Sequence, residues 1–372
     1  MFLWGSAIYA QSPSCLDDFE NFEIMEPPVN PTDRNQHYLP TIAWYGECVL
    51  IGSSTGLSLI DPRNPEQHLH LAHITDRSIN HVAVNEQTKT IAFNVAQEPV
   101  VFIVQSGGSV SSIRAERQAV TALAVSADGH LIAVASSDIQ ADYGLYYDTQ
   151  IQIATTDGQL VSNFEPDTDI EIITDMFFGE EDMSVLTHNV WPGYFGDDIA
   201  LWNVVTGSPR WNYNDLTSNL QTLSDSDPLA ITTMTFQDDI ILLGGLDGYY
   251  NDRNFYGYGV HLWDIRTRHR IKTIRVRSRF DESDIYSMPG LLMAFDSQRP
   301  ILATSFGDSS VQFHEVETGK RIGEFTSEQE HVRQIVMNPD QDLLAILTDE
   351  NVAIFDLEMM QIVASFSLLN II

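Results

Sequence analysis

Residues 295–325 read FDSQRPILATSFGDSSVQFHEVETGKRIGEF and contain the pattern that decides the fold. Apolar and polar residues alternate in short segments, and Gly, Pro, Asp and Ser lie between the segments. This pattern is typical of antiparallel strands joined by tight hairpins. The stretch therefore predicts a hairpin (295–308), a third strand (311–319) and a fourth strand that ends near residue 325.

The same unit recurs along the chain. Its third strand is the clearest part and can be read at GLSLID (56–61), VVFIVQ (100–105), IQIATTDG (151–158), IALWNVVTG (199–207), VHLWDIRT (260–267), VQFHEVETG (311–319) and VAIFDL (352–357). A self-similar unit at such spacing is the mark of a repeat architecture.

Seven units of four short strands predict an all-β chain that folds as a seven-bladed β-propeller of four-stranded antiparallel blades. We assign residues 38–372 to the propeller and residues 1–37 to an N-terminal segment. The last unit contains all four of its own strands, so the sequence shows no exchanged strand that closes the ring. Residues 19–26 could add an extra edge strand.

The charge of the chain narrows the classes of partner. There are 19 basic and 52 acidic residues, for a formal net charge of −33. A nucleic-acid-binding protein needs positive surface to release phosphate counterions, so we expect no nucleic-acid partner. No apolar stretch reaches the length of a membrane-spanning helix, and we expect no membrane insertion. The acidic surface suits a saline or extracellular setting, or else attracts a cationic partner.

The N-terminal segment suggests the compartment. Residues 1–10, MFLWGSAIYA, resemble the second half of a signal peptide but lack its positively charged region. The alternative is an apolar N-terminal strand. Cys15 and Cys48 are the two cysteines, and they could form one disulfide in an oxidising compartment. We therefore expect an extracytoplasmic location, periplasmic or secreted, in preference to the cytoplasm.

The repeats resemble those of the WD40 family over nearly all of the propeller region. Trp263-Asp264 is a true Trp-Asp dipeptide, and Trp202-Asn203 and Phe355-Asp356 are close variants. Further matches are the turns at Asp128-Gly129 and Pro339-Asp340, and Asp138, Asp308 and Asp349 after second strands. The resemblance implies a propeller that acts as a binding scaffold. The family's Gly-His dipeptide is missing, so its buried His–Ser–Asp–Trp network is not carried over.

A second, narrower resemblance concerns Thr206-Gly207 and Trp211, which look like the tryptophan-docking motif of quinoprotein propellers. That family repeats the motif in most blades, whereas this chain has one copy. We interpret it as turn chemistry, in which Gly supplies a positive φ and Trp packs between blades.

No common catalytic motif is present: there is no G-x-S-x-G, H-E-x-x-H, Walker A or C-x-x-C. His68 and His70 share a strand face, with His73 nearby, but spacing places no third metal ligand beside them. The Asp-rich loops lack the D-x-D-x-D-G spacing of a calcium loop. We therefore expect a non-enzymatic protein with no cofactor and no metal.

Loop length gives the candidate binding site. Connections between second and third strands are long in three consecutive units, at 136–150, 188–198 and 244–259. In a propeller these connections emerge on one face, so adjacent blades place them side by side. Long loops in compact domains are usually functional, and aromatic rings suit recognition. The candidate partner-binding residues are Tyr143, Tyr146, Tyr147, Trp191, Tyr194, Phe195, Tyr249, Tyr250, Asn254 and Tyr256.

An open, tyrosine-rich surface fits a protein or peptide better than an enclosed small ligand. The same rings could instead pack on one another to stabilise their own loops. A carbohydrate-binding or carbohydrate-active propeller is the alternative function, because rings stack on sugars and carboxylate pairs can serve as acid and base. The candidate pairs are Asp197 with Asp198 and Asp247 with Asp252. The long connection at 214–230 could border the same surface.

A basic strip stands out on an otherwise acidic chain. It contains Arg268, Arg270, Lys272, Arg275 and Arg277, which alternate with Ile271, Ile274 and Val276. The charges could protect an exposed sheet edge from aggregation. They could also dock an acidic partner, which makes the strip a secondary candidate site. We expect the protein to be a monomer.

Overall fold

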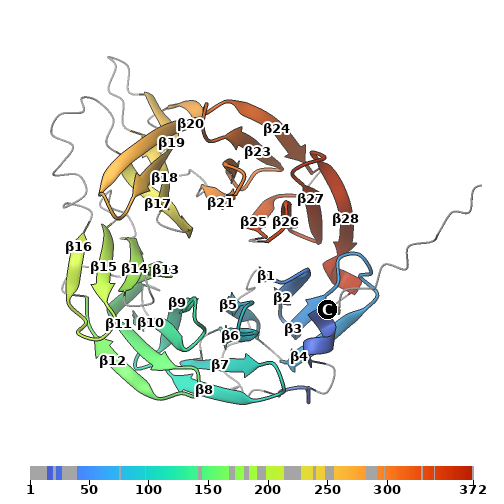
Figure 1. The fold of residues 1–372 in the computed structure, drawn as a ribbon, viewed down its shortest axis with the longest axis vertical. Coiled ribbons are helices and arrows are strands. Elements are labelled where there is room, and N and C mark those ends of the chain that lie inside the picture. Colours follow the sequence, from blue (N-terminus) through green and yellow to red (C-terminus); the bar gives the residue numbers. More distant parts are fainter. Residues whose placement is uncertain are drawn as a thin grey trace, which may run out of the picture.

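A computed structural model describes the chain over residues 15–19, 22–26, 40–74, 77–96, 98–140, 145–166, 172–179, 184–190, 198–212, 228–237, 240–247, 255–281, 291–296, 298–327, 330–338 and 340–370. Seven four-stranded antiparallel sheets stand around a central axis (Figure 1). The predicted fold class, an all-β seven-bladed propeller, is confirmed. The strands of each blade follow one another in sequence from the axis outward.

The first four blades are built from consecutive strands. Blade 1 contains β1 (Thr41–Tyr45), β2 (Cys48–Gly52), β3 (Gly56–Ile60) and β4 (His68–His73). Blade 2 contains β5 (Ile79–Asn85), β6 (Thr90–Val95), β7 (Val100–Gln105) and β8 (Val110–Arg114). Blade 3 contains β9 (Ala119–Val125), β10 (Leu131–Gln140), β11 (Leu145–Thr155) and β12 (Leu160–Phe164). Blade 4 contains β13 (Ile172–Gly179), β14 (Ser184–Val190), β15 (Asp198–Asn203) and β16 (Pro209–Asn212).

The last three blades follow the same plan. Blade 5 contains β17 (Pro228–Gln237), β18 (Ile240–Asp247), β19 (Phe255–Asp264) and β20 (His269–Asp281). Blade 6 contains β21 (Leu292–Asp296), β22 (Ile301–Ser305), β23 (Ser310–Glu315) and β24 (Arg321–Thr326). Blade 7 contains β25 (Val332–Met337), β26 (Leu343–Thr348), β27 (Asn351–Asp356) and β28 (Gln361–Ser367). Short 3-10 helices flank the ring at η1 (Cys15–Phe19) and η4 (Leu368–Asn370).

The core lies between adjacent blades. Middle strands are covered on both faces, as in β2 and β3, whose residues are all buried. Outer strands such as β28 are mostly exposed. One cluster joins Ala133 and Ile151 of blade 3 to Met176 and Trp202 of blade 4. Because each blade has two apolar faces, a blade is stable only when it is stacked between neighbours.

The ring closes between blade 7 and blade 1 through side chains. Gln334 of β25 accepts a hydrogen bond from the Ile42 amide (2.9 Å) and donates one to the Ile42 carbonyl (3.2 Å). Trp44 Nε1 donates to the Val336 carbonyl at 2.8 Å. Apolar residues of both blades form one cluster across the seam, including Ile42, Trp44, Ala345 and Leu347. The expectation that blade 7 owns all four of its strands is confirmed.

The bonds at the seam resemble those elsewhere in the ring. Asn338, just after β25, donates to the Gly46 carbonyl of blade 1 at 2.9 Å. Asn85, at the end of β5, donates in the same way to the Ser126 carbonyl of blade 3 at 2.6 Å. A recurring asparagine thus joins the end of one first strand to the next blade. The seam between blades 7 and 1 therefore shares this bond with the junction between blades 2 and 3.

The N-terminal segment packs on blade 1. A disulfide joins Cys15 of η1 to Cys48, with the Cα atoms 6.0 Å apart. Phe19 is 1% exposed and lies against the ring of Tyr45. Met25 pairs with the outer strand β4, where its carbonyl accepts from the His73 amide at 2.8 Å. The possible edge strand within 19–26 is thus reduced, among the described residues, to a single bridge between Met25 and Ala72.

We predict that Gln334→Ala lowers the free energy of unfolding by about 1–3 kcal/mol, because two backbone groups of Ile42 lose their partner at the seam. Denaturation in urea measures the change. Gln361→Ala is the control, since Gln361 begins the outer strand β28 and its side chain donates to the Met359 sulfur of the adjacent turn rather than to another blade. Equal stability of the two variants would contradict the role given to Gln334.

We predict that Cys15→Ser, or reduction of the wild type, lowers the free energy of unfolding by at most about 4 kcal/mol. That is the loop-closure value for a cross-link of this span. The His73 amide should then exchange faster with deuterium, because Met25 is no longer held against β4. Urea denaturation with and without reductant, combined with hydrogen exchange, measures both effects. Unchanged stability and unchanged exchange would show that the disulfide does not hold the segment.

Candidate functional site

The two faces of the ring differ in their connections. We call the face that carries the links between second and third strands, and between blades, the hairpin face. The opposite face carries the links between first and second strands, and we call it the turn face. Antiparallel pairing in all seven blades fixes this alternation. The candidate partner-binding residues belong to the hairpin face. A cavity opens on the turn face.

That cavity lies at the turn-face end of the central channel and has a volume of about 520 Å³. Its walls come from the first strands of blades 2 to 5 and include Leu123, Val125, Phe178 and Phe236. A second cavity of about 350 Å³ shares Val84 and Phe236 with it and is lined by the first strands of blades 1, 2, 5, 6 and 7. Together the two cavities form a channel whose walls are largely apolar.

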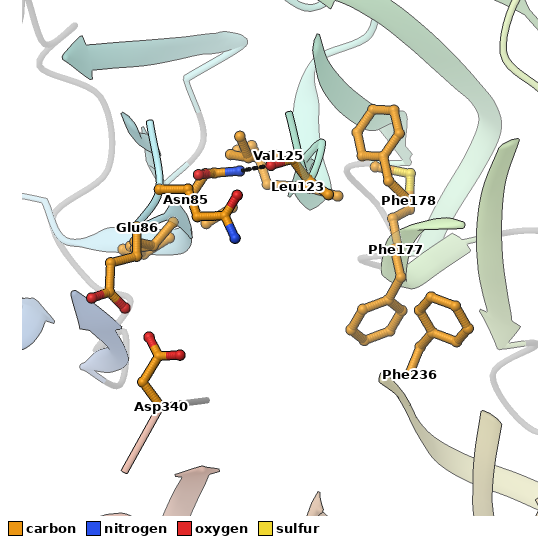
Figure 2. Close-up of a pocket in the computed structure, with 15 residues that line it drawn as sticks. Asn85, Glu86, Leu123, Val125, Phe177, Phe178, Phe236 and Asp340 are labelled. Carbon is orange, nitrogen blue, oxygen red and sulfur yellow. Dashed lines mark hydrogen bonds between the residues drawn. The ribbon is translucent and has the colours of Figure 1, made fainter. Parts of the chain in front are cut away.

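Polar groups gather on one side of this cavity. Glu86 follows β5, and Asp340 lies in the turn between β25 and β26. Their carboxyl groups point toward one another, while Phe177 and Phe236 lie across the cavity from them (Figure 2). Burial, together with hydrogen bonding to Asp340 and repulsion by it, raises the pKa of Glu86 to about 7. The pair therefore holds a proton at mildly acidic pH, a state that two close carboxyl groups favour.

Blade 1 fixes the position of Glu86. Gly46 turns the chain between β1 and β2 with φ of +58°, a conformation that favours glycine. Its amide bonds to the Glu86 carboxylate, and an added Cβ would lie 3.1 Å from Glu86 Oε1. The Gly46 carbonyl in turn accepts from Asn338. Residues of blades 7, 1 and 2 thus meet at the cavity mouth.

Most of the candidate partner-binding residues lie outside the described residues: Tyr143, Trp191, Tyr194, Phe195, Tyr249, Tyr250 and Asn254. Tyr146 and Tyr147 lie in β11, and Tyr256 lies in β19, where only their backbone positions are described. Asp198 is the first residue of β15 in blade 4, and Asp247 is the last residue of β18 in blade 5. Asp197 and Asp252 lie outside the described residues. The predicted binding surface and the carboxylate pairs therefore remain predictions.

The connections predicted at 136–150 and 244–259 are shorter than expected, because paired strands extend into both ranges on the hairpin face. In blade 3, β10 and β11 stay paired out to Gln140 and Leu145. In blade 5, β19 and β20 pair out to Phe255 and Asp281. The corresponding strands of blade 1, β2 to β4, are only five or six residues long. Tyr258, which belongs to the same aromatic loop sequence, is 1% exposed and packs on Phe306 at 4.9 Å. This ring therefore belongs to the core between blades 5 and 6.

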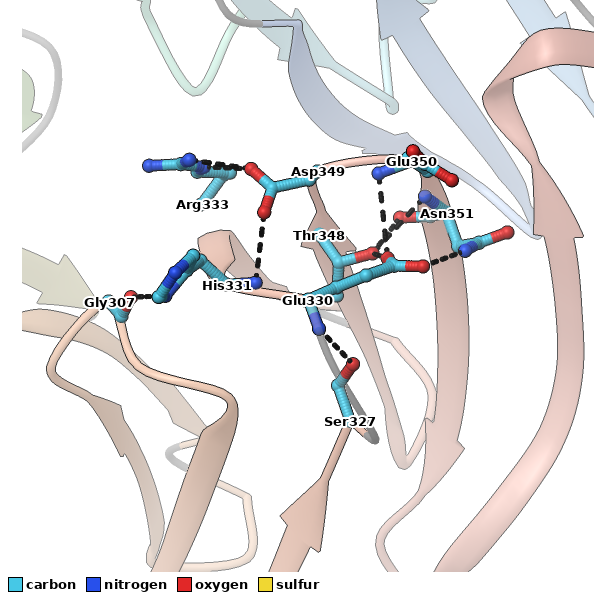
Figure 3. Close-up of polar contacts among 9 residues, drawn as sticks. All are labelled: Gly307, Ser327, Glu330, His331, Arg333, Thr348, Asp349, Glu350 and Asn351. Atoms are coloured by element: carbon cyan, nitrogen blue, oxygen red, sulfur yellow. Dashed lines mark hydrogen bonds and ion pairs between the residues drawn. The ribbon is translucent and has the colours of Figure 1, made fainter.

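Two of the aspartates expected after second strands bond to the segment that enters their blade; Asp349 follows β26 as expected, whereas Asp138 lies within β10. Asp138 accepts from the Gln118 amide at 3.2 Å. Asp349 accepts from the His331 amide at 3.0 Å and pairs with Arg333 at 2.6 Å (Figure 3). Although burial opposes it, the His331 bond and the Arg333 charge lower the pKa of Asp349. Asp308 differs, because it caps its own turn at Ser310.

Glu330 organises the neighbouring part of this network. Its carboxylate accepts hydrogen bonds from the Thr348 hydroxyl and from the side-chain amide of Asn351, both in blade 7 (Figure 3). Its own amide donates to Ser327 Oγ at 3.2 Å. Both carboxylate oxygens of Glu330 thus accept hydrogen bonds, and these bonds hold the connection between blades 6 and 7 in place. We assign it a structural role.

The basic strip lies on β20 and the turn before it. Arg268 takes a positive φ in that turn, Arg275 is exposed, and Arg270 and Lys272 are half-buried. Lys272 Nζ donates to the Glu317 carbonyl of blade 6. The backbone of Arg277 continues the strand.

The expected alternation along this strip is wrong at one position. Ile274 and Val276 point inward, but Ile271 is 56% exposed. Ile271 lies three positions before Ile274, and successive side chains of a strand point to opposite faces. Ile271 therefore shares the outward face with Arg275 rather than the inward face with Ile274.

The histidines of β4 make local contacts. The His68 and His70 rings meet edge to face at 5.0 Å, which confirms their shared face. His70 Nδ1 bonds to Ser58 Oγ at 2.9 Å. No group of three metal-ligating side chains suited to an ion occurs among the described residues. Within the same ranges, no helix is long and apolar enough to cross a membrane.

Thr206-Gly207 forms the turn that the sequence predicts. Gly207 has φ of +65°, and its amide donates to the Asn203 carbonyl at 2.9 Å. A Cβ at Gly207 would lie 2.7 Å from the Phe164 ring of blade 3. Both observations explain glycine at this position through turn geometry and packing. The side chain of Trp211 lies outside the described residues.

Sequence reasoning missed the channel cavity. Its polar residues come from turns of blades 2 and 7, and its aromatic residues come from the first strands of blades 4 and 5. Asp340 is present in the sequence as part of a Pro-Asp turn, but nothing in that dipeptide indicates a partner more than 250 positions away. One available signal was the large apolar residue near the end of several first strands, such as Phe178 and Phe236.

Comparison with known proteins agrees on the fold. Neither a protein-family model nor a curated protein sequence matches the chain. Among solved structures, hydrazine synthase from Kuenenia stuttgartiensis matches with a TM-score of 0.61 and 11% identity, over 84% of this chain and 93% of that one. The computationally designed Ika8 protein matches with a TM-score of 0.55 and 16% identity, over 89% and 87% respectively. Identities this low show a shared fold alone.

We predict that the wild type loses stability relative to Glu86→Gln as the pH rises from about 4.5 to about 7. The folded protein holds the Glu86 proton more tightly than the unfolded chain, so folding is favoured below this window and that advantage is lost through it. Urea denaturation of both proteins at several pH values measures the difference. Parallel pH profiles would show that Glu86 titrates normally.

Proposed function

We propose that the protein is a non-enzymatic binding scaffold of the WD40 type. It binds a protein or peptide through the hairpin face of blades 3 to 5. The observation that carries this proposal is the extension of blades 3 and 5 beyond the length of the other blades. The extended hairpins stand on either side of blade 4, whose own connection is long in sequence. Rigid strands that support long loops are the usual basis of a recognition surface.

Three features of the ring support the WD40 type. Asp138 and Asp349 hold the incoming connection of their blades. Trp202 Nε1 donates to Thr187 Oγ1 at 3.0 Å within blade 4, in a buried bond between the second and third strands. These bonds resemble part of the network that the family buries in each blade.

Blade 5 shows where the resemblance stops. Trp263 occupies the register position of Trp202, but Leu243 takes the position of Thr187. The Trp263 indole N–H is accordingly buried without a partner among the described residues. Blade 5 therefore keeps the architecture of blade 4 without this bond.

The partner class follows from charge and surface. Tyrosine and tryptophan side chains supply large contact area with a polar tip, which suits a broad protein surface. The net charge of −33 favours a partner with positive charge at the hairpin face. The basic strip of Arg268, Arg270, Lys272, Arg275 and Arg277 offers a secondary contact for acidic groups.

The test is a quantitative pull-down from extract of the source organism with three proteins. One is the wild type, and one carries Tyr147→Ala, Trp191→Ala and Tyr250→Ala. The third is a matched control with Leu160→Ala, Ile362→Ala and Val363→Ala, which removes exposed apolar groups from outer strands. Loss of central aromatic contacts should reduce recovery of a specific partner about tenfold or more. The control should recover it like the wild type.

All three proteins must first show the same melting temperature. Equal recovery by the aromatic variant and the wild type overturns the assignment of the hairpin face. If Arg275→Glu alone then abolishes recovery, the basic strip is the binding site. Binding of immobilised polysaccharide by the wild type, lost in the aromatic variant, supports the carbohydrate alternative instead.

A further inference from the structure

We propose that the turn-face end of the channel binds a small amphiphilic cation, an organic ammonium with a linear apolar chain. The apolar chain lies along the channel between the first strands, and the ammonium group lies between Glu86 and Asp340. This site is on the opposite face from the proposed partner-binding surface. It is therefore independent of that function.

The size and lining of the cavity fit such a ligand. A volume of about 520 Å³ lies within the usual range for small-molecule sites. Leu123, Val125 and Phe178 give it apolar walls, and the ring of Phe236 packs on that of Phe177 at 6.4 Å. The second cavity continues past Val84 and Phe236 toward Trp44 and Met293. Because the two cavities share lining residues, an apolar chain that enters the first can continue into the second.

The position of the charges selects a cation. Glu86 and Asp340 face one another on one side of the cavity, opposite the aromatic residues (Figure 2). An ammonium group has three N–H donors and can satisfy both carboxylates at once. It would also replace the proton that the pair otherwise needs to reduce its mutual repulsion. A carboxylate or phosphate ligand would add a third negative charge at the same place.

The groups around Glu86 set the expected pH dependence. Asp340 from blade 7 and Glu47 from blade 1 both raise the pKa of Glu86, and the Gly46 amide lowers it. Tyr45 faces the same turn, but burial and the nearby carboxylates of Asp18 and Glu86 raise its pKa, so it stays neutral. Lys89, on the same face, pairs with Asp18. Below about pH 7 a cation must displace a proton from the pair, so binding should weaken as the pH falls.

The test is calorimetric titration of the full chain with n-octylammonium chloride, with 1-octanol as the neutral analogue of equal chain length. At pH 8 we expect octylammonium to bind about tenfold or more tightly than octanol. Butylammonium should bind about tenfold or more weakly than octylammonium, because four fewer methylene groups are buried. Octylammonium should bind more weakly at pH 5.5 than at pH 8.

Substitutions of the two acids test where the ammonium group binds. Glu86→Gln and Asp340→Asn should each weaken octylammonium binding about tenfold and leave octanol binding unchanged. Glu358→Gln is the matched control, because Glu358 is an exposed acid in the β27–β28 turn at the outer rim of the same face. It should bind like the wild type. The pH dependence should disappear in Glu86→Gln.

Each contrary result overturns the proposal. Equal binding of octanol and octylammonium would show a channel that accepts any apolar chain. Unchanged binding in both Glu86→Gln and Asp340→Asn would show that the cation binds elsewhere on the acidic surface. Absence of octylammonium binding to the folded wild type would reject the site itself.

Discussion

The structure depends on closure of the ring between β25 and β1. A blade exposes two apolar faces, and an open ring would leave the outer faces of blades 1 and 7 in water. At the seam an apolar cluster covers these two faces. A glutamine side chain also makes the pair of backbone hydrogen bonds that a neighbouring strand would make. Gln334 bonds both backbone groups of Ile42, and Asn338 secures Gly46 one turn further on. Among the described strands, each blade consists of four consecutive ones and none is exchanged between the chain's two ends.

Closure also builds the channel mouth. Asp340 belongs to the last blade, Gly46 to the first and Glu86 to the second, and only the closed ring places them together. The disulfide and the Asp18–Lys89 ion pair hold the N-terminal helix η1 on the same face. The hairpin face depends less on the seam, because its long hairpins belong to blades 3 to 5 on the far side of the ring. The two faces can therefore differ in what they bind.

The sequence was enough to predict the architecture. Alternating apolar residues and turn residues predicted the strands of each blade. The seven copies of the third strand predicted the number of blades. Met25 as an edge residue and the intact last blade were also readable. The seam was not, because Gln334 and Ile42 lie 292 positions apart and a single glutamine carries no repeat signal. The channel site was missed for the same reason, since Glu86 and Asp340 look like ordinary turn residues. Ile271 was misplaced because it lies an odd number of positions from Ile274 and so points to the opposite face of the strand.

A circular permutant tests the seam most directly. The new chain would begin at Leu291, between blades 5 and 6, and a flexible linker would join Ile372 to Met1. If side chains close the ring at β1 and β25 as they do at other junctions, the permutant should keep the wild-type circular dichroism spectrum. It should also unfold in one cooperative transition. A permutant that fails to fold, or that unfolds in two separate transitions, would contradict a ring held by equivalent junctions.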